Sequence, residues 1–475
     1  MAIVVNREVA GDLNNPSVDL LDYCIQEHLM QVQRLERLSD YYDGKQDILK
    51  RKKENEAAPN NKVLINHAKY VVDMNVGFMV GNPIAYTSDT DKNIKPILDL
   101  YDEIDIVSHD TELEKDLSTF GIGYELVYLK INKDETTQPM IKCIDPRGIF
   151  LVTDDTVDKN PLFAIHHQPV FDLQGGISYF LVKYYNDNRV LTYRCNSQGW
   201  GDYNLIKALP HYFGAVPVIE YRNNEEKQGD FEQAMTLIDA YNLLQSDRLN
   251  DKEAFVDAIM FIQGFLLADG DGEKLMKEKL LQTSASPSET AAGYLTKELD
   301  ESGVDVLRDA ILDDIHKVTY VPNLNDENFA GNVSGESMKY KLFGLLQLMS
   351  VKSRYMVKGL RQRMQIIENF LKIKDKTIDA TGTKIKLKPN LPINTTDIIN
   401  QIVQAYSAGI LPLKILLTWL PDIDDVDEVL KQLTEEKERQ IDMNQKMLGQ
   451  QAEDSHSDLD DEPEEDEDER EESGT

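Results

Sequence analysis

Apolar residues recur every three or four positions through most of the chain, which predicts a mainly helical protein. In the first 120 residues this pattern predicts helices over residues 18–49, 64–81 and 94–117. Gly44 interrupts the first of these helices. Pro83 prevents the second from continuing, and the string NPIAY around it indicates a short strand.

Between residues 123 and 221 the period of the pattern changes to two. Strand-like segments in this region are separated by Asp, Asn and Gly, which favour turns. The segments are YELVYLKI, MIKCIDP, FAIHHQPVF, YFLVKYY and VLTYRC. Their alternation predicts an antiparallel sheet.

The helical period returns after residue 230 and predicts a helix over residues 231–255. Its second half is rich in Asn, Gln, Ser and Asp, which indicates a surface that faces water or neighbouring subunits, as in a bundle or ring. Two predicted strands, 258–267 and 291–299, flank the helical string EKLMKEKLL and form a small α/β unit. A second helix is predicted over residues 304–322.

A long helix is predicted over residues 338–371, roughly 51 Å at 1.5 Å per residue. Gly344 and Gly359 are positions where so long a helix could bend. Its apolar stripe consists of Met338, Leu342, Leu345, Met349, Met356, Leu360, Met364, Ile367 and Leu371. The string TKIKLKPNLPIN then predicts a strand, and the chain is predicted to be helical to about residue 447, with a break at LPLKILLTWLP.

A length of 475 residues predicts two to four domains or an elongated shape. The chain has neither a long apolar run nor a signal-peptide pattern at its start, so we expect no membrane span. Its three cysteines are far apart and form no CxxC motif. This spacing argues against a disulfide framework and a structural zinc site, and favours buried thiols.

The formal net charge of -33 is concentrated partly in the C-terminal tail. Residues 453–475 contain 14 acidic side chains and one arginine, so residues 448–475 are predicted to be a disordered acidic tail. Such a tail is either a solubilising extension or a segment that keeps DNA and basic partners away from a surface.

The stretch from Ser337 to Ile367 reverses this charge bias, because it contains seven Lys or Arg residues and no Asp or Glu. It follows the flexible string NFAGNVSGES. One interpretation is a solvated face or a partner for acidic surfaces elsewhere in the chain. The other is a weak, sequence-independent attraction for DNA phosphates. The basic positions considered are Lys339, Lys341, Lys352, Arg354, Lys358 and Arg361.

Catalytic and metal-binding motifs are not indicated. There is no P-loop, the GxG of FGIGYE precedes a strand rather than opening a helix, and the calcium-like string ADGDGEKLMKEKL has Lys274 where glycine is required. His166 and His167 are adjacent in a predicted strand and so point to opposite faces. The acidic group after residue 423 suits a helix N-terminus. We therefore predict no enzyme activity, no cofactor and no metal.

Several strings together resemble one protein family across nearly the whole chain outside the tail. They are YYDGKQDIL, LINHAKYVVDMNVGFMVGNPIAY, HYFGAVPVIEYRNNEEKQGDFEQAMTLIDAYNLLQSDRLNDKEAF and NFAGNVSGESMKYKL. In this order they resemble the portal proteins of long-tailed bacteriophages. The acidic tail matches no motif of that family.

The resemblance implies an α+β, elongated and mainly helical portal fold with an antiparallel sheet in its wing. The implied regions are a wing (1–230 and 338–394), two stem helices (231–255 and 304–322), a clip (256–303), a tunnel loop (323–337) and a helical crown (395–447), followed by the tail (448–475). Portals of this family are non-enzymatic rings, twelve-fold in the virion, through which double-stranded DNA is packaged and ejected at one capsid vertex.

The resemblance also implies a site and partners. DNA would pass the tunnel loop and the adjacent helix, with secondary basic positions at Lys352, Arg354 and Lys358. The implied tunnel residues are Asn328, Gly331, Asn332, Ser334, Gly335, Lys339 and Lys341. Implied partners are other copies of the chain, terminase, a head-completion or adaptor protein, and the major capsid and scaffolding proteins, without a membrane. The location would be the virion, with assembly in the host cytoplasm.

Two other classes are weighed against the portal. A non-channel structural or scaffolding-like assembly protein would share the composition but would not form rings with an axial hole. A nuclease would need a carboxylate and histidine constellation that the sequence does not contain.

Overall fold

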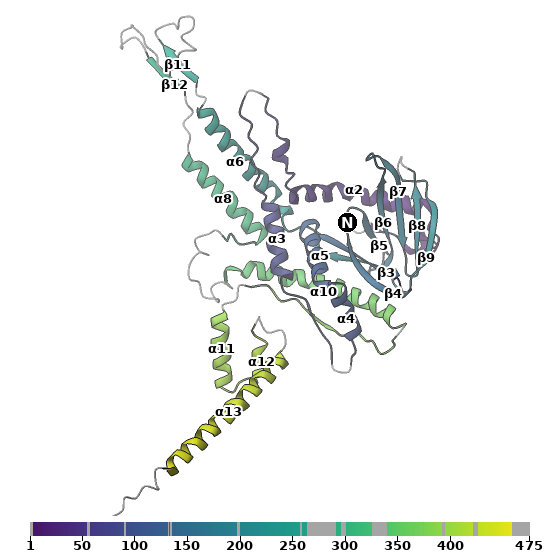
Figure 1. Cartoon of the computed structure of the whole chain (residues 1–475). Coiled ribbons are helices and arrows are strands. Elements are labelled where there is room, and N and C mark those ends of the chain that lie inside the picture. Colours follow the sequence, from purple (N-terminus) through teal and green to yellow (C-terminus); the bar gives the residue numbers. More distant parts are fainter. Residues whose placement is uncertain are drawn as a thin grey trace, which may run out of the picture. The chain divides into compact units, whose positions relative to one another are not determined.

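The computed structural model describes residues 3–54, 58–89, 92–131, 133, 135–196, 200–256, 259–263, 291–295, 301–324, 340–373, 375–391, 395–420 and 426–457 (Figure 1). The chain divides into two compact units, Met1–Leu391 and Pro392–Thr475. Helices and antiparallel sheets alternate in the first unit, and the described elements of the second are helical. The predicted α+β fold class is therefore confirmed.

The N-terminal part is helical, with one break that the sequence pattern did not predict. Its helices are α1 (Arg7–Ala10), α2 (Val18–Tyr42), η1 (Asp47–Lys50), α3 (His67–Val80), α4 (Lys95–Glu103) and α5 (Ile106–Phe120). The single helix expected over residues 94–117 is thus two helices. Asp105 separates them with a left-handed φ of 52° and accepts a hydrogen bond from the Ser108 amide at 3.5 Å, which caps α5.

A six-stranded sheet forms the outer part of the first unit. Its strands lie in the order β1 (Ile3–Val4), β5 (Ile149–Thr153), β6 (Pro161–Phe171), β7 (Ile177–Tyr185), β8 (Arg189–Cys195) and β9 (Asn204–Pro210). All neighbours are antiparallel except β1 and β5. Helix α2 contributes Leu21, Cys24 and Ile25 to the core that covers one face of this sheet, together with Phe163 and Tyr184.

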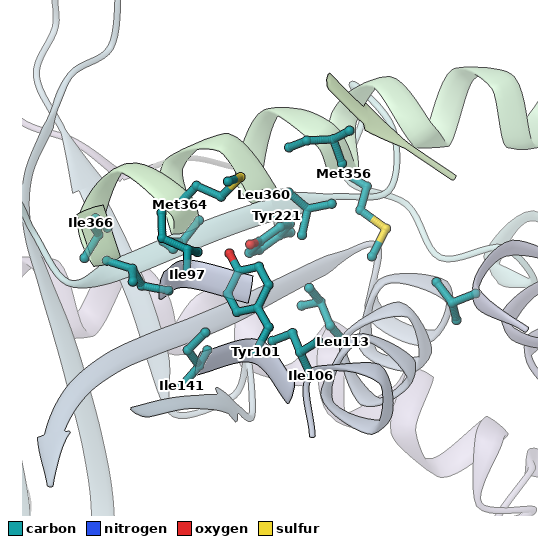
Figure 2. Packing of buried hydrophobic residues seen from close by; sticks show 14 of the residues in the cluster. Ile97, Tyr101, Ile106, Leu113, Ile141, Tyr221, Met356, Leu360, Met364 and Ile366 are labelled. Atoms are coloured by element: carbon teal, nitrogen blue, oxygen red, sulfur yellow. The ribbon is translucent and has the colours of Figure 1, made fainter. Parts of the chain in front are cut away.

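A three-stranded antiparallel sheet packs one face against both α5 and the long helix α10 (Phe343–Leu371). Its order is β10 (Val218–Arg222), β3 (Ile122–Ile131) and β4 (Thr137–Ile144). Met356, Leu360 and Met364 of α10 face Tyr221 and Leu113 in this core (Figure 2). The apolar stripe predicted for the helix is confirmed where the structure describes it, because every member from Leu342 to Ile367 is buried.

Gly359 has a packing role instead of the predicted bend. A Cβ atom at this position would lie 2.3 Å from the Tyr221 ring. Glycine therefore allows the strand β10 side chain to approach the backbone of α10. Helix α10 itself runs without interruption from Phe343 to Leu371.

Helices α6 (Met235–Val256) and α8 (Glu301–Thr319) lie side by side, with the 3-10 turn η2 (Glu232–Ala234) before α6 (Figure 1). Between them in the chain, β11 (Ile259–Gln263) and β12 (Ala291–Leu295) pair antiparallel. Both strands of the predicted α/β unit are thus present. The predicted helix EKLMKEKLL lies outside the described residues.

The remaining elements are a small strand pair and three helices. β2 (Ala85–Thr87) pairs antiparallel with β13 (Lys384–Lys386). The second unit contains α11 (Thr395–Ser407), α12 (Leu413–Leu417) and α13 (Val426–Ser457). Helix α13 continues ten residues beyond position 447, where the helical region was expected to end.

Candidate DNA-channel segment

The basic residues of α10 divide into an exposed group and a buried group. Arg354 and Lys358 are exposed and are one helical turn apart, so they lie on the same side of the helix. Arg361 is also exposed, and Lys341 is half-buried just before α10. These four positions retain the exposure that a contact with DNA phosphates requires.

Lys352 does not belong to this group, and the prediction that it offers its charge to DNA is wrong. Its side chain is only 3% exposed. The Nζ atom donates a hydrogen bond of 2.7 Å to Asp230 and lies 2.7 Å from a carboxylate oxygen of Glu114. Burial alone would lower the pKa of Lys352, but the charges of Asp230 and Glu114 outweigh burial and raise the pKa.

The contact between Lys352 and Asp230 joins α10 to the residue just before the first predicted stem helix. Asp230 also accepts hydrogen bonds from Ser118 at 2.6 Å and from Asn223 at 2.7 Å. Glu114 has fewer partners than Asp230, and its contact with Lys352 at 2.7 Å is its ion pair. Burial therefore raises the pKa of Glu114 above its usual value, although Lys352 opposes the shift.

Arg363 forms a second buried charge cluster, eleven positions further along α10. Its Nη2 donates to Asp110 at 2.7 Å and its Nε donates to Glu125 at 3.0 Å. Glu125 also accepts a hydrogen bond of 2.6 Å from Tyr221 and lies 2.7 Å from His109 Nε2. Both clusters place one cation against two carboxylates, so Lys352 and Arg363 contribute no positive charge to the surface.

Most of the predicted tunnel loop lies outside the described residues. Asn328, Gly331, Asn332, Ser334, Gly335 and Lys339 all lie outside the described residues. Their role as channel-lining residues stays a prediction. The helix that follows them in the chain is described, and α10 is held to α5 and β3 through Asp110, Glu114 and Glu125.

The two predicted stem helices contact each other through apolar and charged side chains. Arg248 and Asp305 form an ion pair of 3.1 Å, and Lys252 pairs with Glu301. These pairs run in opposite order along the two helices, so α6 and α8 are antiparallel. Apolar side chains also remain exposed on the pair, at Leu243, Leu249, Val306 and Leu307.

The polar residues in the second half of α6 have a function within the subunit that the sequence pattern did not reveal. Asn242, Ser246 and Asn250 are buried, contrary to the expectation that this part of the helix faces water or neighbours, whereas Lys252 and Glu253 are exposed as expected. They accept hydrogen bonds from the backbone amides of Ile65, Val63 and Asn61 at 2.9, 3.0 and 2.7 Å. The signal that could have indicated this polar ladder is the spacing of four between Asn242, Ser246 and Asn250.

The geometry explains why this spacing works. Two residues of an extended chain cover about 6.6 Å, and one turn of four helical residues rises about 6 Å. Every second amide of the segment 61–65 therefore meets every fourth residue of α6. The ladder attaches the loop between α2 and α3 to the first predicted stem helix.

The histidine pair at positions 166 and 167 is structural. His167 is buried, and its Nε2 lies 2.9 Å from Nδ1 of His28. The rings of Phe150 and Trp200 lie beside it. Burial lowers the pKa of His28 to about 4 and that of His167 to about 3, so both rings are neutral at physiological pH.

Neither a candidate membrane span nor a candidate metal site is found in the described part of the chain. No helix there is both long enough and apolar enough to cross a membrane. No group of three or more His, Cys, Asp or Glu side chains there has an arrangement suited to a metal ion.

Comparison with known proteins matches the chain to one family model. The model, "Phage portal protein, SPP1 Gp6-like", matches residues 21–443. The chain is similar to the portal protein of Bacillus phage SPP1, with 22% identity over 96% of this chain and 93% of the relative. It is also similar to the portal protein of Clostridium phage phiCD119, with 24% identity over 86% of this chain and 93% of the relative.

Similar solved structures come from GTA particle necks. A chain from the neck of an empty GTA particle with C6 symmetry has a TM-score of 0.43 and 13% identity, over 75% of this chain and 90% of that chain. A chain from the neck of a native particle with C12 symmetry has a TM-score of 0.40 and 13% identity, over 74% and 88%. Since the family model matches most of its length, the chain belongs to the SPP1-type phage portal proteins.

Proposed function

We propose that copies of this protein close into a ring at one capsid vertex and form the channel through which double-stranded DNA is packaged and ejected. The observation that carries the proposal is the family match over residues 21–443, which includes every region of the predicted portal architecture except the tail. The ring is proposed to be twelve-fold in the virion. Its role is structural and not enzymatic.

The exposed apolar side chains of the stem helices support a ring. Val306 is 71% exposed and Leu307 is 50% exposed in the single subunit. Exposed apolar surface of this kind is stabilised when a neighbouring copy covers it. We therefore assign residues 231–255 and 304–322 to the stem, 256–303 to the clip, and 1–230 with 338–394 to the wing.

DNA contact is assigned to the tunnel loop, residues 323–337, with Lys339 and Lys341 behind it and Arg354 and Lys358 as secondary positions. Such contacts would be to phosphates and would not read sequence. The net charge of -33 on each subunit would keep the attraction weak, which suits a duplex that must slide.

The remaining partners follow from the portal role. The clip is proposed to dock terminase during packaging and the head-completion or adaptor protein afterwards. The wing and the crown, residues 395–447, are proposed to contact capsid and scaffolding proteins. The protein would be assembled in the host cytoplasm and located at the portal vertex of the virion.

Electron microscopy of the purified full chain tests the ring. Rings with an axial hole wide enough for a duplex are expected. Shells, solitary particles or a closed bore under all assembly conditions would overturn the proposal and favour a non-channel structural or scaffolding-like protein.

A DNA-packaging assay tests the channel contacts separately. Replacement of Lys339 and Lys341 by glutamate is expected to reduce packaging while rings still form, because carboxylates would repel the phosphates. Lys130→Glu, which changes an exposed lysine on β3, is the matched control. If the double variant packages DNA as well as wild type does, Lys339 and Lys341 do not contact the DNA in the channel.

A further inference from the structure

Strand β9 is an open edge of the six-stranded sheet. It pairs with β8 and with no other strand in the described chain, and Figure 1 shows it at the end of the sheet. Every residue from Asn204 to Pro210 is exposed. In an antiparallel strand, alternate residues direct their backbone N–H and C=O groups away from the neighbour. The outer side of β9 therefore offers a template for another strand.

The side chains of β9 are unusually apolar for an exposed edge. Leu205, Ile206 and Leu209 are 53%, 58% and 47% exposed. Proteins commonly blunt such edges, because an uncovered apolar strand promotes unwanted association. Three large apolar side chains on one exposed edge strand indicate a surface that another polypeptide covers.

The charges around this edge determine what kind of strand fits. Strands β6 to β9 carry four basic side chains, Lys183, Arg189, Arg194 and Lys207, and no acidic ones, although the chain as a whole has a net charge of -33. The acidic residues of this region are confined to turns, at Asp172, Asp187 and Asp202.

Strand register brings three of the basic side chains to one face. Lys183 pairs with Thr192, and Thr192 pairs with Lys207. Arg194 is two residues from Thr192 on the same strand, so it lies on the same face. A strand added beside β9 would place every second side chain next to Lys207 on this face, whereas Arg194 lies one strand further in, with its guanidinium over the Tyr179 ring of β7.

We propose that the open edge of β9 binds an extended segment of a partner protein in which acidic and apolar side chains alternate. The segment would extend the sheet by one strand, with a carboxylate beside Lys207. A second copy of β9 fits poorly, because two-fold pairing would bring the basic faces together. The inference is independent of the channel proposal.

Binding of a labelled synthetic peptide in which glutamate and valine alternate tests the inference, measured by fluorescence anisotropy with the full chain. Saturable binding that weakens with salt is expected. The variant Lys207→Glu is expected to weaken binding by about fivefold, since the cross-strand charge pair at this position becomes repulsive. The same variant should gain affinity for a lysine–valine peptide.

Two controls separate strand addition from general charge attraction. Lys130→Glu, an exposed change on a different sheet, should leave binding unchanged. A glutamate–valine peptide methylated on alternate backbone nitrogens should not bind, because it cannot complete the strand ladder. The inference is overturned if the acidic peptide does not bind, in which case Lys207 only protects the edge from association. It is also overturned if the methylated peptide binds equally well or if Lys130→Glu weakens binding as much as Lys207→Glu.

Discussion

Helices α10 and α6 both bury polar side chains against distant parts of the chain, but α10 buries charges whereas α6 buries amides and a hydroxyl. On α10, Arg363 bonds to residues more than 200 positions away, in α5 and β3. On α6, Asn242, Ser246 and Asn250 bond to consecutive odd-numbered amides of one extended segment.

The two networks should differ in how they fail. A buried ion left without its partner cannot be solvated, so the loss of one member of a charge cluster affects every other member. The loss of one neutral hydrogen bond costs less free energy of unfolding than the loss of a buried ion pair. The remaining hydrogen bonds from α6 still hold the segment 61–65. Attachment of α10 is therefore expected to be all-or-none, and attachment of the loop to α6 is expected to be graded.

Arg363→Met should have the largest effect. It leaves Glu125 and Asp110 buried without their cation and should lower the free energy of unfolding by about 4 kcal/mol. Chemical denaturation at fixed protein concentration measures this effect. The matched control is Arg361→Met, an exposed position on the same helix, which should change stability by less than about 0.5 kcal/mol. Similar effects of the two variants would contradict the assignment.

The pH dependence of the Arg363 effect should come next in size. Burial alone would raise the pKa of Glu125, but Arg363 and His109 outweigh burial and lower the pKa from 4.5 to about 2. The folded state thus favours the carboxylate, and this contribution is fully present above pH 4.5 and is lost as the pH falls toward 2.

The contribution of Glu125 is on the order of 3 kcal/mol, since each pKa unit is worth about 1.4 kcal/mol. The stability difference between wild type and Arg363→Met should narrow as the pH is lowered below 4.5 in denaturation experiments. The effect of Ser246→Ala should not change with pH, because its hydroxyl does not titrate. A constant Arg363 effect down to pH 2 would show that Glu125 is not the partner that matters.

Asn242→Ala should have an intermediate effect of about 2 kcal/mol. The change removes the acceptor of the Ile65 amide and the donor to Gln46, both in a buried environment. Amide hydrogen exchange should show faster exchange at Ile65 than in wild type. If the exchange of Ile65 does not change, the ladder is not what holds this segment.

Ser246→Ala, on the middle rung, should have the smallest effect, about 1 kcal/mol. Ser350→Ala, an exposed serine in the interior of α10, is the control and should be nearly neutral. If Asn242→Ala and Arg363→Met lowered the free energy of unfolding by the same amount, buried charges on α10 and buried neutral groups on α6 would not differ in the way proposed.

Sequence reasoning succeeded where the signal is local. The change of period at residue 123 correctly indicated the antiparallel sheets, and the apolar stripe of α10 was correctly identified as buried from Leu342 to Ile367, with Leu371 half-buried. It failed at Asp105, because a left-handed residue between two amphipathic helices does not disturb the apolar pattern on either side. It also failed at Lys352, because a lysine in a basic stretch of sequence has the same local residue pattern whether its side chain is exposed or buried.

The sequence by itself determined the order and type of the elements and the family, since both depend on residues that are near one another in the chain. Only the tertiary structure decided which charges face water. Lys352 and Asp230 are 122 positions apart, and Arg363 and Glu125 are 238 apart. The free energy of a charged side chain depends on the groups that surround it in space. When those groups come from distant parts of the chain, the local sequence pattern does not identify them.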